Sequence, residues 1–414
     1  MLGWIRRESR VTRSRRCAVV VAVAAATAVL AATAAAQGSS RSSGAAAAVH
    51  TTPSGRIPNQ YIVVLDGRVP THPTSRSERR AKAADERVAH SVGVKPMFVY
   101  NADLEGFAAD LTRVQLSELR HSKSVRFVEP DERVHEEGVQ TSAPWDLTRI
   151  DERGLDLNGV YSYSSTGAGV SIYIIDTGIQ ANNVDFGSRA RFAFNSVDSR
   201  NEDCNGHGTH VAGIAGGTTY GVAKLATLVG VKVLNCQGSG TISSVIAGVN
   251  WVTEHHVVGK SVANMSLGGG ASAAMDDAVR HMIESGVFVS VAAGNDNRDA
   301  CTYSPARVPE AFTVSASDSA DRKASFSNQG PCVDAYAPGV AITSDWIGSP
   351  TATNTISGTS MASPLVAGIA ALYLSEHLST PAATGVWIVD QATTGVISNN
   401  AANTADRLVY KSDL

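Results

Sequence analysis

Four residues in this sequence have the types and the spacing needed to do chemistry together. Asp176 ends the apolar run VSIYIID, His207 stands between two glycines in NGHGTH, and Ser360 opens a helical run in SGTSMASP. A serine attacks well only when a neighbouring base takes its proton, and the base needs an acid to orient it and stabilise its charged form. Asn295, at the end of VFVSVAAGN, could donate its amide to a developing oxyanion, together with the backbone N–H of Ser360.

Each of these residues also has an ordinary structural interpretation. Ser360 could cap the helix that follows it, because serine side chains accept hydrogen bonds from the free N–H groups of a first turn. Asp176 and Asn295 could be turn residues, and His207 could be a surface histidine. One such interpretation is reasonable, but four of them at four strand or helix ends of one chain require four separate coincidences. We therefore favour a nucleophilic site.

The surrounding segments predict an α/β domain that positions these residues. Short apolar runs such as VSIYIID, TLVGVKVL, SVANMS and VFVSVAAGN alternate with helical stretches such as TISSVIAGVNWVTEHH and AMDDAVRHMIESG. Apolar strands joined by helices typically form a mostly parallel sheet with helices on both faces. Functional residues gather beyond the carboxyl ends of such strands, where Asp176 and Asn295 lie.

A smaller α+β domain precedes this one. Residues 57–137 contain strand-like and helical segments in the order β-α-β-β-α-β, which is typical of a ferredoxin-like domain, and Thr112 is the expected cap of the second helix. The turn-rich segment HEEGVQTSAPW then marks a boundary near residue 137, with the larger domain at residues 138–414. Residues 37–56 are of low complexity and predict a spacer without a core of its own.

The N-terminus predicts export. A basic lead is followed by an alanine-rich apolar run with an Ala-x-Ala end, so we expect a secretory signal at residues 1–36, cut near Ala36. A membrane anchor is the alternative, but alanine is weakly apolar and no later segment is long and apolar enough to span a bilayer. We expect a secreted, extracellular protein that has no membrane association once the signal is removed.

The charge balance argues against a nucleic-acid partner. The whole chain has a formal net charge of −3, and residues 138–414 carry 15 Lys and Arg against 24 Asp and Glu. An acidic domain of this kind offers no basic stripe for a phosphate backbone.

The cysteine content predicts disulfides. Cys17 lies in the predicted signal, which leaves an even number of cysteines in an exported protein, and two disulfides are the natural interpretation. The four are Cys204, Cys236, Cys301 and Cys332, for which three pairings are possible. A zinc site is disfavoured because the chain has no Cys-x-x-Cys pair.

The sequence resembles the subtilisin-like serine proteases. The chain order of acid, histidine and serine is the subtilisin order, and IIDTGI, NGHGTHVAG and SGTSMASP look like the signature segments of that family. YGVAKLATLVGVKVL, VANMSLGGG, VAAGNDN, YSPA and ASFSNQG are similar to the proteinase K group, most of all to its aqualysin-like bacterial members. The resemblance covers nearly all of residues 140–414, and residues 57–137 resemble the inhibitory propeptide of the family.

The resemblance implies a secreted serine endopeptidase, made as a self-processing zymogen. Asp176 would be the orienting acid and His207 the general base. Ser360 would be the nucleophile and Asn295 the oxyanion donor. The implied substrate edge and pocket consist of Gly238, Ser239, Gly240, Ser266, Leu267, Gly268, Ala292, Ala293 and Gly294. These small and uncharged groups predict broad specificity, with apolar or aromatic residues preferred before the cut.

The expected partners are peptide and protein substrates and the chain's own propeptide, which would act as an intramolecular inhibitor of a monomeric enzyme. The resemblance also implies the disulfides Cys204–Cys236 and Cys301–Cys332, and no organic cofactor. A structural calcium ion is expected at Asp334 with the carbonyls of Pro309 and Ala311. A second calcium site of the family is only partly matched, by Asp151 and Glu152, because Thr148 stands where an acid is expected.

The chain departs from the family after the nucleophile. Members usually have Thr-Pro-His there, whereas this chain has Ser363, Pro364 and Leu365. The replaced histidine is not a triad member, so we expect altered packing or rate rather than loss of activity. A non-catalytic, peptide-binding member of the fold is the alternative function. Such a module would not need to keep the aspartate, histidine, asparagine and serine of the catalytic set together: Asp176, His207, Asn295 and Ser360.

Overall fold

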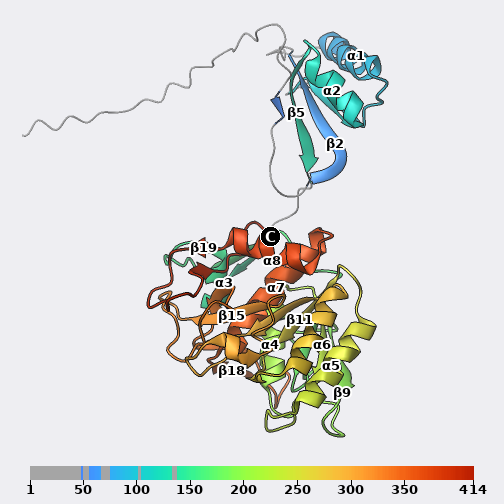
Figure 1. The fold of residues 1–414 in the computed structure, drawn as a ribbon. Helices are drawn as coiled ribbons and strands as arrows, with labels where there is room; N and C mark the ends of the chain where they lie inside the picture. Colours follow the sequence, from blue (N-terminus) through green and yellow to red (C-terminus); the bar gives the residue numbers. More distant parts are fainter. Residues whose placement is uncertain (1–47, 50–55, 67–74, 101–103, 133–137) are drawn as a thin grey trace, which may run out of the picture. The chain divides into compact units, whose positions relative to one another are not determined.

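The computed structural model describes residues 48–49, 56–66, 75–100, 104–132 and 138–414. The predicted signal peptide, most of the predicted spacer and residues 133–137 at the predicted boundary lie outside the described residues. The chain divides into two compact units, whose main segments are Ile57–Asp131 and Glu132–Leu414. Figure 1 draws the first unit in blue to teal and most of the second in green to red.

The first unit is a small α+β domain. Its elements are β1 (Ala48–Val49), β2 (Arg56–Leu65), α1 (Ser75–Ser91), β3 (Phe98–Tyr100), β4 (Gly106–Asp110), α2 (Arg113–His121) and β5 (Val125–Glu132). From β2 onward this is the predicted β-α-β-β-α-β order, in a sheet of strand order β1-β5-β2-β4-β3. Thr112 caps α2, as expected. The edge strand β1 was not expected, because it lies in the predicted spacer. It pairs in parallel with β5.

The second unit contains a large, mostly parallel sheet, which confirms the predicted fold class. The sheet runs in the order β19 (Thr393–Thr394), β20 (Arg407–Leu408), β16 (Ala335–Pro338), β15 (Phe312–Ser317), β13 (Phe288–Ala292), β11 (Ser261–Met265), β8 (Ser171–Asp176), β10 (Thr227–Lys232) and β9 (Ala190–Asn195). All neighbours in it are parallel except β19 and β20.

Helices and short antiparallel pairs surround this sheet. The helices are α3 (Trp145–Asp151), α4 (His207–Gly216), α5 (Ile242–His255), α6 (Ala273–Glu284), the short 3-10 helix η1 (Ala300–Thr302), α7 (Thr359–Glu376) and α8 (Pro381–Gln391). The antiparallel pairs are β6 (Gly138–Thr141) with β7 (Val160–Tyr163), β12 (Gly269–Gly270) with β14 (Tyr303–Ser304), and β17 (Ile342–Asp345) with β18 (Thr353–Ile356).

Two apolar cores lie on opposite faces of the sheet. Side chains alternate between the faces of a strand, so Ile172 and Ile174 of β8 join the core formed with α4 and α7. Tyr173 and Ile175 join the other core, formed with α5 and α6. Figure 1 shows α5 and α6 side by side, on a different side of this unit from α8. Apolar side chains are therefore buried on both faces of the central strands.

The carboxyl ends of three neighbouring strands meet at one edge of the sheet. β8 ends at Asp176, β11 leads into Ser266, and β13 leads into the segment 293–295. Parallel pairing in register brings these ends out together, at the edge where ligands bind in open α/β sheets.

Candidate active site

Asp176 and His207 form the centre of this edge. The Asp176 carboxylate is fully buried, and its two oxygens lie 2.8 and 3.0 Å from Nδ1 of His207. The N–H of Thr177 donates to the same carboxylate at 2.7 Å. Because a carboxylate can only accept, Nδ1 of His207 carries the hydrogen and Nε2 is left to act as a base. The imidazole is about a quarter exposed, so it can reach a substrate.

The conformation of the turn before His207 accounts for two of its residues, Gly206 and Asp203. Gly206 caps α4 with a φ of +105°, and a Cβ there would lie 2.5 Å from the ring of Trp346. Only glycine fits such a position without strain. The buried carboxylate of Asp203 accepts the N–H groups of Asn205, Gly206 and Thr209. The turn that presents His207 is thus held from inside.

The pKa of His207 is shifted upward. Burial alone lowers it, but the charge of Asp176 and the hydrogen bond to Asp176 outweigh burial, with a further contribution from Asp203. The imidazolium that forms when His207 accepts a proton is therefore stabilised where catalysis needs it.

Ser360 is the second residue of α7 and is not a helix cap. Gly358 occupies the N-cap position, and no side chain caps the helix there. The Ser360 hydroxyl donates to the backbone carbonyl of Ser266 at 3.2 Å. Within the described part of the chain, no hydrogen bond joins Ser360 directly to His207. Instead, Ser266 lines both the cavity that contains His207 and the adjoining cavity that contains Ser360.

Asn295 is oriented by the residue before Ser360. Its Oδ1 accepts the N–H and the hydroxyl of Thr359, both at 2.9 Å. Since both partners are donors, the amide oxygen is fixed on that side and Nδ2 is free to donate elsewhere. A Cβ added at Gly358 would lie 3.5 Å from Nδ2 of Asn295 and 3.6 Å from the backbone nitrogen of Ser360. The two donors therefore converge on one space, which glycine leaves open.

The predicted substrate residues line two adjoining cavities of about 580 and 380 Å³. The larger is lined by Gly238, Ser239, Gly240, Ser266, Leu267 and Gly268 together with His207. The smaller is lined by Ala292, Ala293, Gly294, Asn295 and Ser360, and shares the Ser266–Gly268 wall. Sequence reasoning missed Met275 in the larger cavity and Tyr303 and Asp296 in the smaller one. Asp296 directly follows Asn295, and it adds an acid to a lining that we expected to be uncharged.

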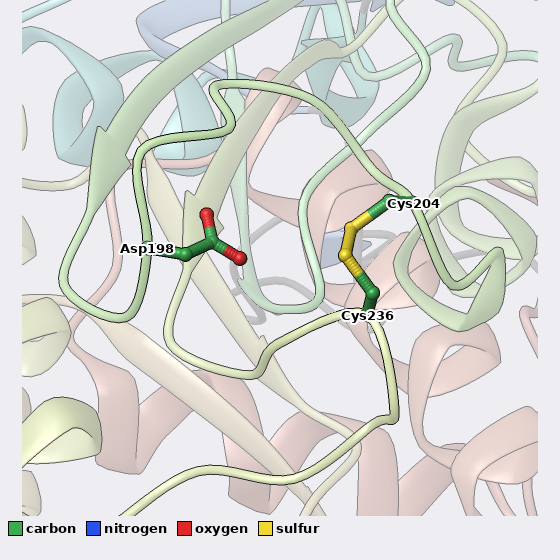
Figure 2. Close-up of side chains that lie close together, drawn as sticks. All are labelled: Asp198, Cys204 and Cys236. Carbon is green, nitrogen blue, oxygen red and sulfur yellow. A yellow bond between two sulfur atoms is a disulfide. The ribbon is translucent and has the colours of Figure 1, made fainter.

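The two disulfides of the structure are Cys204–Cys236 and Cys301–Cys332, the pairing that the resemblance implied. The first joins the turn before His207 to the segment that leads into Gly238. Figure 2 shows this bond with the Asp198 carboxylate beside it. Among the described residues, Asp198, Cys204 and Cys236 are the group of potential metal ligands whose ligand atoms lie close together. Because the two sulfurs are bonded to each other, neither is a thiolate ligand.

The expected calcium position and the partly matched one differ in the structure. The carboxylate of Asp334 accepts the N–H of Thr313 at 2.7 Å, in the strand that follows Ala311. Burial raises the pKa of Asp334 to about 6, although the Thr313 hydrogen bond and the charge of Arg407 oppose this. A cation next to Asp334 would favour the ionised form of its carboxylate, which is a ligand type that hard cations prefer.

The second position already contains a cation of the protein itself. Asp151 forms an ion pair with the buried ammonium of Lys411 at 2.8 Å and accepts the N–H of Ser162. Glu152 accepts the amide of Asn158. Thr148, which stands where an acid was expected, donates to the carbonyl of Trp145. The carboxylate that matched this site is therefore neutralised without a metal.

Comparison with known families agrees with this geometry. Residues 167–410 match the Subtilase family. The chain is a subtilase. Residues 60–136 of this subtilase match the Peptidase inhibitor I9 family, which identifies the first unit as its propeptide domain.

Several relatives of this subtilase are named proteases. It is 48% identical over 368 residues to an extracellular serine proteinase of a Thermus species, covering 86% of this chain and 90% of that protein. It is 41% identical over 374 residues to a cuticle-degrading serine protease of Arthrobotrys oligospora, covering 86% and 91%. A cold-adapted subtilisin-like serine proteinase of known structure shares 49% identity with a TM-score of 0.63, covering 66% of this chain and 99% of that one.

These findings make the subtilase a subtilisin-like serine endopeptidase with an N-terminal inhibitor-type propeptide domain. Within the described residues, no helix combines the length and the apolar character that crossing a membrane requires.

Proposed function

We propose that this subtilase is a secreted endopeptidase in which Ser360 is the nucleophile, His207 the general base and Asp176 the orienting acid. The observation that carries the proposal is the fixed Asp176–His207 pair. Through Ser266, the cavity of that pair adjoins the cavity that contains Ser360 and Asn295. These groups supply the base, the nucleophile and the oxyanion donors of acyl transfer at one edge of the sheet.

The reaction follows from the hydrogen bonds of these groups. When a peptide is bound, the Ser360 hydroxyl turns from the Ser266 carbonyl to Nε2 of His207, which takes its proton as Oγ attacks the peptide carbonyl carbon. The amide of Asn295 and the N–H of Ser360 receive the oxyanion. His207 then protonates the leaving amine as the C–N bond breaks. Water repeats the steps on the acyl-enzyme and releases the acid.

Substrate preference is proposed from the cavity walls. The glycines at 238, 240 and 268 line the cavities without side chains of their own, so an extended peptide could approach their main chain and add there as a strand. The walls at Ala292, Ala293 and Tyr303 are apolar or aromatic, which suits an apolar side chain before the cut. Asp296 is exposed and also lines this cavity, to which it adds a charged group.

Three further proposals concern the whole chain. Residues 1–36 direct export and are removed near Ala36, in keeping with a relative that is named extracellular. Residues 57–137 inhibit the mature unit until it cuts near residue 138. Asp334, with the carbonyls of Pro309 and Ala311, would hold a calcium ion, which neutralises a half-buried carboxylate and stabilises the loops that supply the ligands.

A fluorophosphonate probe tests the catalytic assignment directly. Such a probe phosphonylates only an activated serine, so we expect the purified mature enzyme to be labelled at Ser360, as located by peptide mass mapping. His207→Ala should react far more slowly, and Ser360→Ala should not react at all. A folded wild-type protein that binds peptides without being labelled would instead be the non-catalytic alternative.

A further inference from the structure

A proline leaves one carbonyl of α7 without its helical partner. In an α-helix the N–H of a residue donates to the carbonyl four residues earlier. Pro364 lies inside α7 and has no N–H, so the carbonyl of Ser360 lacks the donor that an α-helix would supply four residues later. The hydroxyl of Ser266 donates to that carbonyl instead, at 2.8 Å. The carbonyl of the proposed nucleophile is therefore bonded to the substrate edge in place of that helical donor.

Asn264, the residue before the last of β11, fixes the direction of this bond. Its Nδ2 donates to the Ser266 hydroxyl at 2.9 Å, and its Oδ1 accepts from the hydroxyl of Ser363 at 2.7 Å. A hydroxyl has one hydrogen to donate. Because Ser266 already accepts from Asn264, its own hydrogen is directed to the Ser360 carbonyl. Asn264 and Ser363 are fully buried, and Ser266 is only 3% exposed.

The same hydrogen bonds continue to a third element. The Ser290 hydroxyl of β13 donates to the carbonyl of Ser363 at 2.9 Å, and the two hydroxyl oxygens lie 3.0 Å apart. The network therefore joins three elements. β11 leads into the substrate edge, β13 leads into the oxyanion donor, and α7 contains the nucleophile. A buried polar network whose members are all paired favours one arrangement of the elements that it connects.

We propose that Asn264 is a positioning residue, which sets Ser360 relative to the substrate edge through the Ser266 hydroxyl. This rests on the proposed role of Ser360 as the nucleophile. Asn264 itself touches no substrate. Without it, the Ser266 hydroxyl can rotate away and release the Ser360 carbonyl. The first turn of α7 can then shift against the edge, and a displacement of about 1 Å at a reacting group can cost 10²-fold in rate.

Asn264→Ala and Ser266→Ala test this positioning role, with Ser261→Ala as the matched control. Ser261 is buried in the same strand, β11, and its hydroxyl donates to the carbonyl of Val257 at 2.8 Å, at the opposite end of the strand. Its loss reports the general cost of removing a buried hydrogen bond from β11. Ser266→Ala removes only a hydroxyl and keeps the backbone of the substrate edge, so it serves even if Asn264→Ala does not fold.

For Asn264→Ala and Ser266→Ala we expect kcat on a peptide anilide to fall about 10- to 100-fold, with KM changed less than about threefold. The rate of fluorophosphonate labelling should fall by the same factor, because labelling needs the nucleophile but not the substrate edge. Ser261→Ala should lower Tm yet keep kcat within about twofold. Equal kcat values for the Asn264 variant and the Ser261 control would overturn the positioning role.

A double variant tests whether Asn264 acts through Ser266. If it does, Asn264→Ala combined with Ser266→Ala should lose about as much kcat as the single variants, because both remove the same hydrogen bond. Losses that multiply would overturn the proposal. The assignment of the nucleophile is judged separately. If the wild type is not labelled at Ser360, the proposed function fails. If the wild type is labelled and the Asn264 variant reacts as fast, only the positioning role fails.

Discussion

At the scale of single residues, the site shows how polar side chains are held before a substrate arrives. Asp176 is fully buried and accepts from both His207 and Thr177. Asn295 is oriented because Thr359 occupies its oxygen with two donors. Groups fixed in this way need no rearrangement when charge develops in the transition state.

The pH dependence of activity should reflect the raised pKa of His207. A base must be neutral to accept a proton, so kcat/KM should fall as pH is lowered, with a midpoint above the ordinary histidine value of 6.5. Asp176→Asn removes the charge that raises this pKa. We expect the variant to have a lower midpoint and a kcat reduced roughly 10⁴-fold, as in chymotrypsin-like triads. Rates on a peptide anilide from pH 5 to 10 check this, and a midpoint unchanged by the substitution would contradict it.

Residue types and chain order were enough to identify the candidate catalytic residues, because each has a distinctive neighbourhood of glycines at a strand or helix end. The sequence did not predict that the Ser360 hydroxyl would rest on the Ser266 carbonyl, or that Tyr303 and Asp296 would line the pocket. These contacts depend on how separate loops meet after folding, which no local pattern encodes.

At the scale of elements, α4 packs against β17, whose last residue is the buried acid Asp345. Burial, then the neighbouring charge of Asp185, raise the pKa of Asp345 to about 8, and Oδ2 of Asp345 has no hydrogen-bond partner among the described residues. The carboxyl lies close to α4, since a Cβ on Gly213 would approach it to 2.6 Å. A charge at Asp345 is therefore unfavourable where two elements meet.

Asp345→Asn should stabilise the enzyme at alkaline pH. The folded state holds a proton that the unfolded chain releases above pH 3.8, so the stability contributed by this proton is lost as pH rises toward about 8. Asparagine cannot ionise. The Tm advantage of the variant should therefore grow from pH 5 to pH 9, by about 2–4 °C for each kcal/mol. Thermal melts in a Ser360→Ala background, which prevents self-digestion, measure it. An advantage independent of pH would mean that Asp345 does not titrate as described.

Calcium should stabilise the loops around Asp334. An ion that binds only the folded state raises stability by mass action. We expect a higher Tm in millimolar calcium than in chelator, and no such difference for Asp334→Asn. Melting curves of the Ser360→Ala protein provide the comparison. Identical curves for the parent protein with and without calcium would argue against the site.

The two disulfides should differ in how readily they are reduced. Nζ of Lys232 lies 3.5 Å from the sulfur of Cys204, and a guanidinium nitrogen of Arg200 lies 3.6 Å from that of Cys236. Nearby cations stabilise thiolates, the leaving groups of reduction by a dithiol. A carboxylate also lies near each bond: Asp198, which is 3.8 Å from Lys232, lies beside Cys204–Cys236, and Asp299 accepts the backbone N–H of Cys301.

We therefore expect Cys204–Cys236 to open first in dilute dithiothreitol, as followed by alkylation and mass mapping. The exposed Arg200 supplies a mild test, because Arg200→Gln should slow the reduction of this bond and leave that of Cys301–Cys332 unchanged. Reduction of Cys301–Cys332 first would contradict the electrostatic argument.

Element types were largely predictable, since apolar strands and capped helices have clear periodic patterns. The strand order of the main sheet agreed with the expected class. The short strand β1 was missed because Ala48 and Val49 have no pattern of their own and form a strand only by pairing with β5. The capping interpretation of Ser360 is excluded by Gly358, which takes that position.

At the scale of the whole molecule, the proposed zymogen makes a simple prediction about processing. The junction near residue 138 is linked to its own active site, so it is present at high effective concentration and should be cut first. Ser360→Ala should fold but accumulate as a precursor that still carries residues 57–137. Gel analysis and N-terminal sequencing, after expression in a host without other extracellular proteases, would compare it with the wild type. Trimming of the variant at the same bond would show that maturation is not autocatalytic.

The Cys204–Cys236 bond also makes one covalent link of the active site depend on the compartment, because it joins the turn before His207 to the segment before Gly238. In a reducing cytoplasm both cysteines remain thiols. The turn before His207 and the segment before Gly238 are then joined by weaker links, such as the hydrogen bond from Asn205 to the Cys236 carbonyl. We expect a chain retained inside the cell to digest protein more slowly than one oxidised after export. The cell's own proteins would thus face a less active protease than the proteins outside it do.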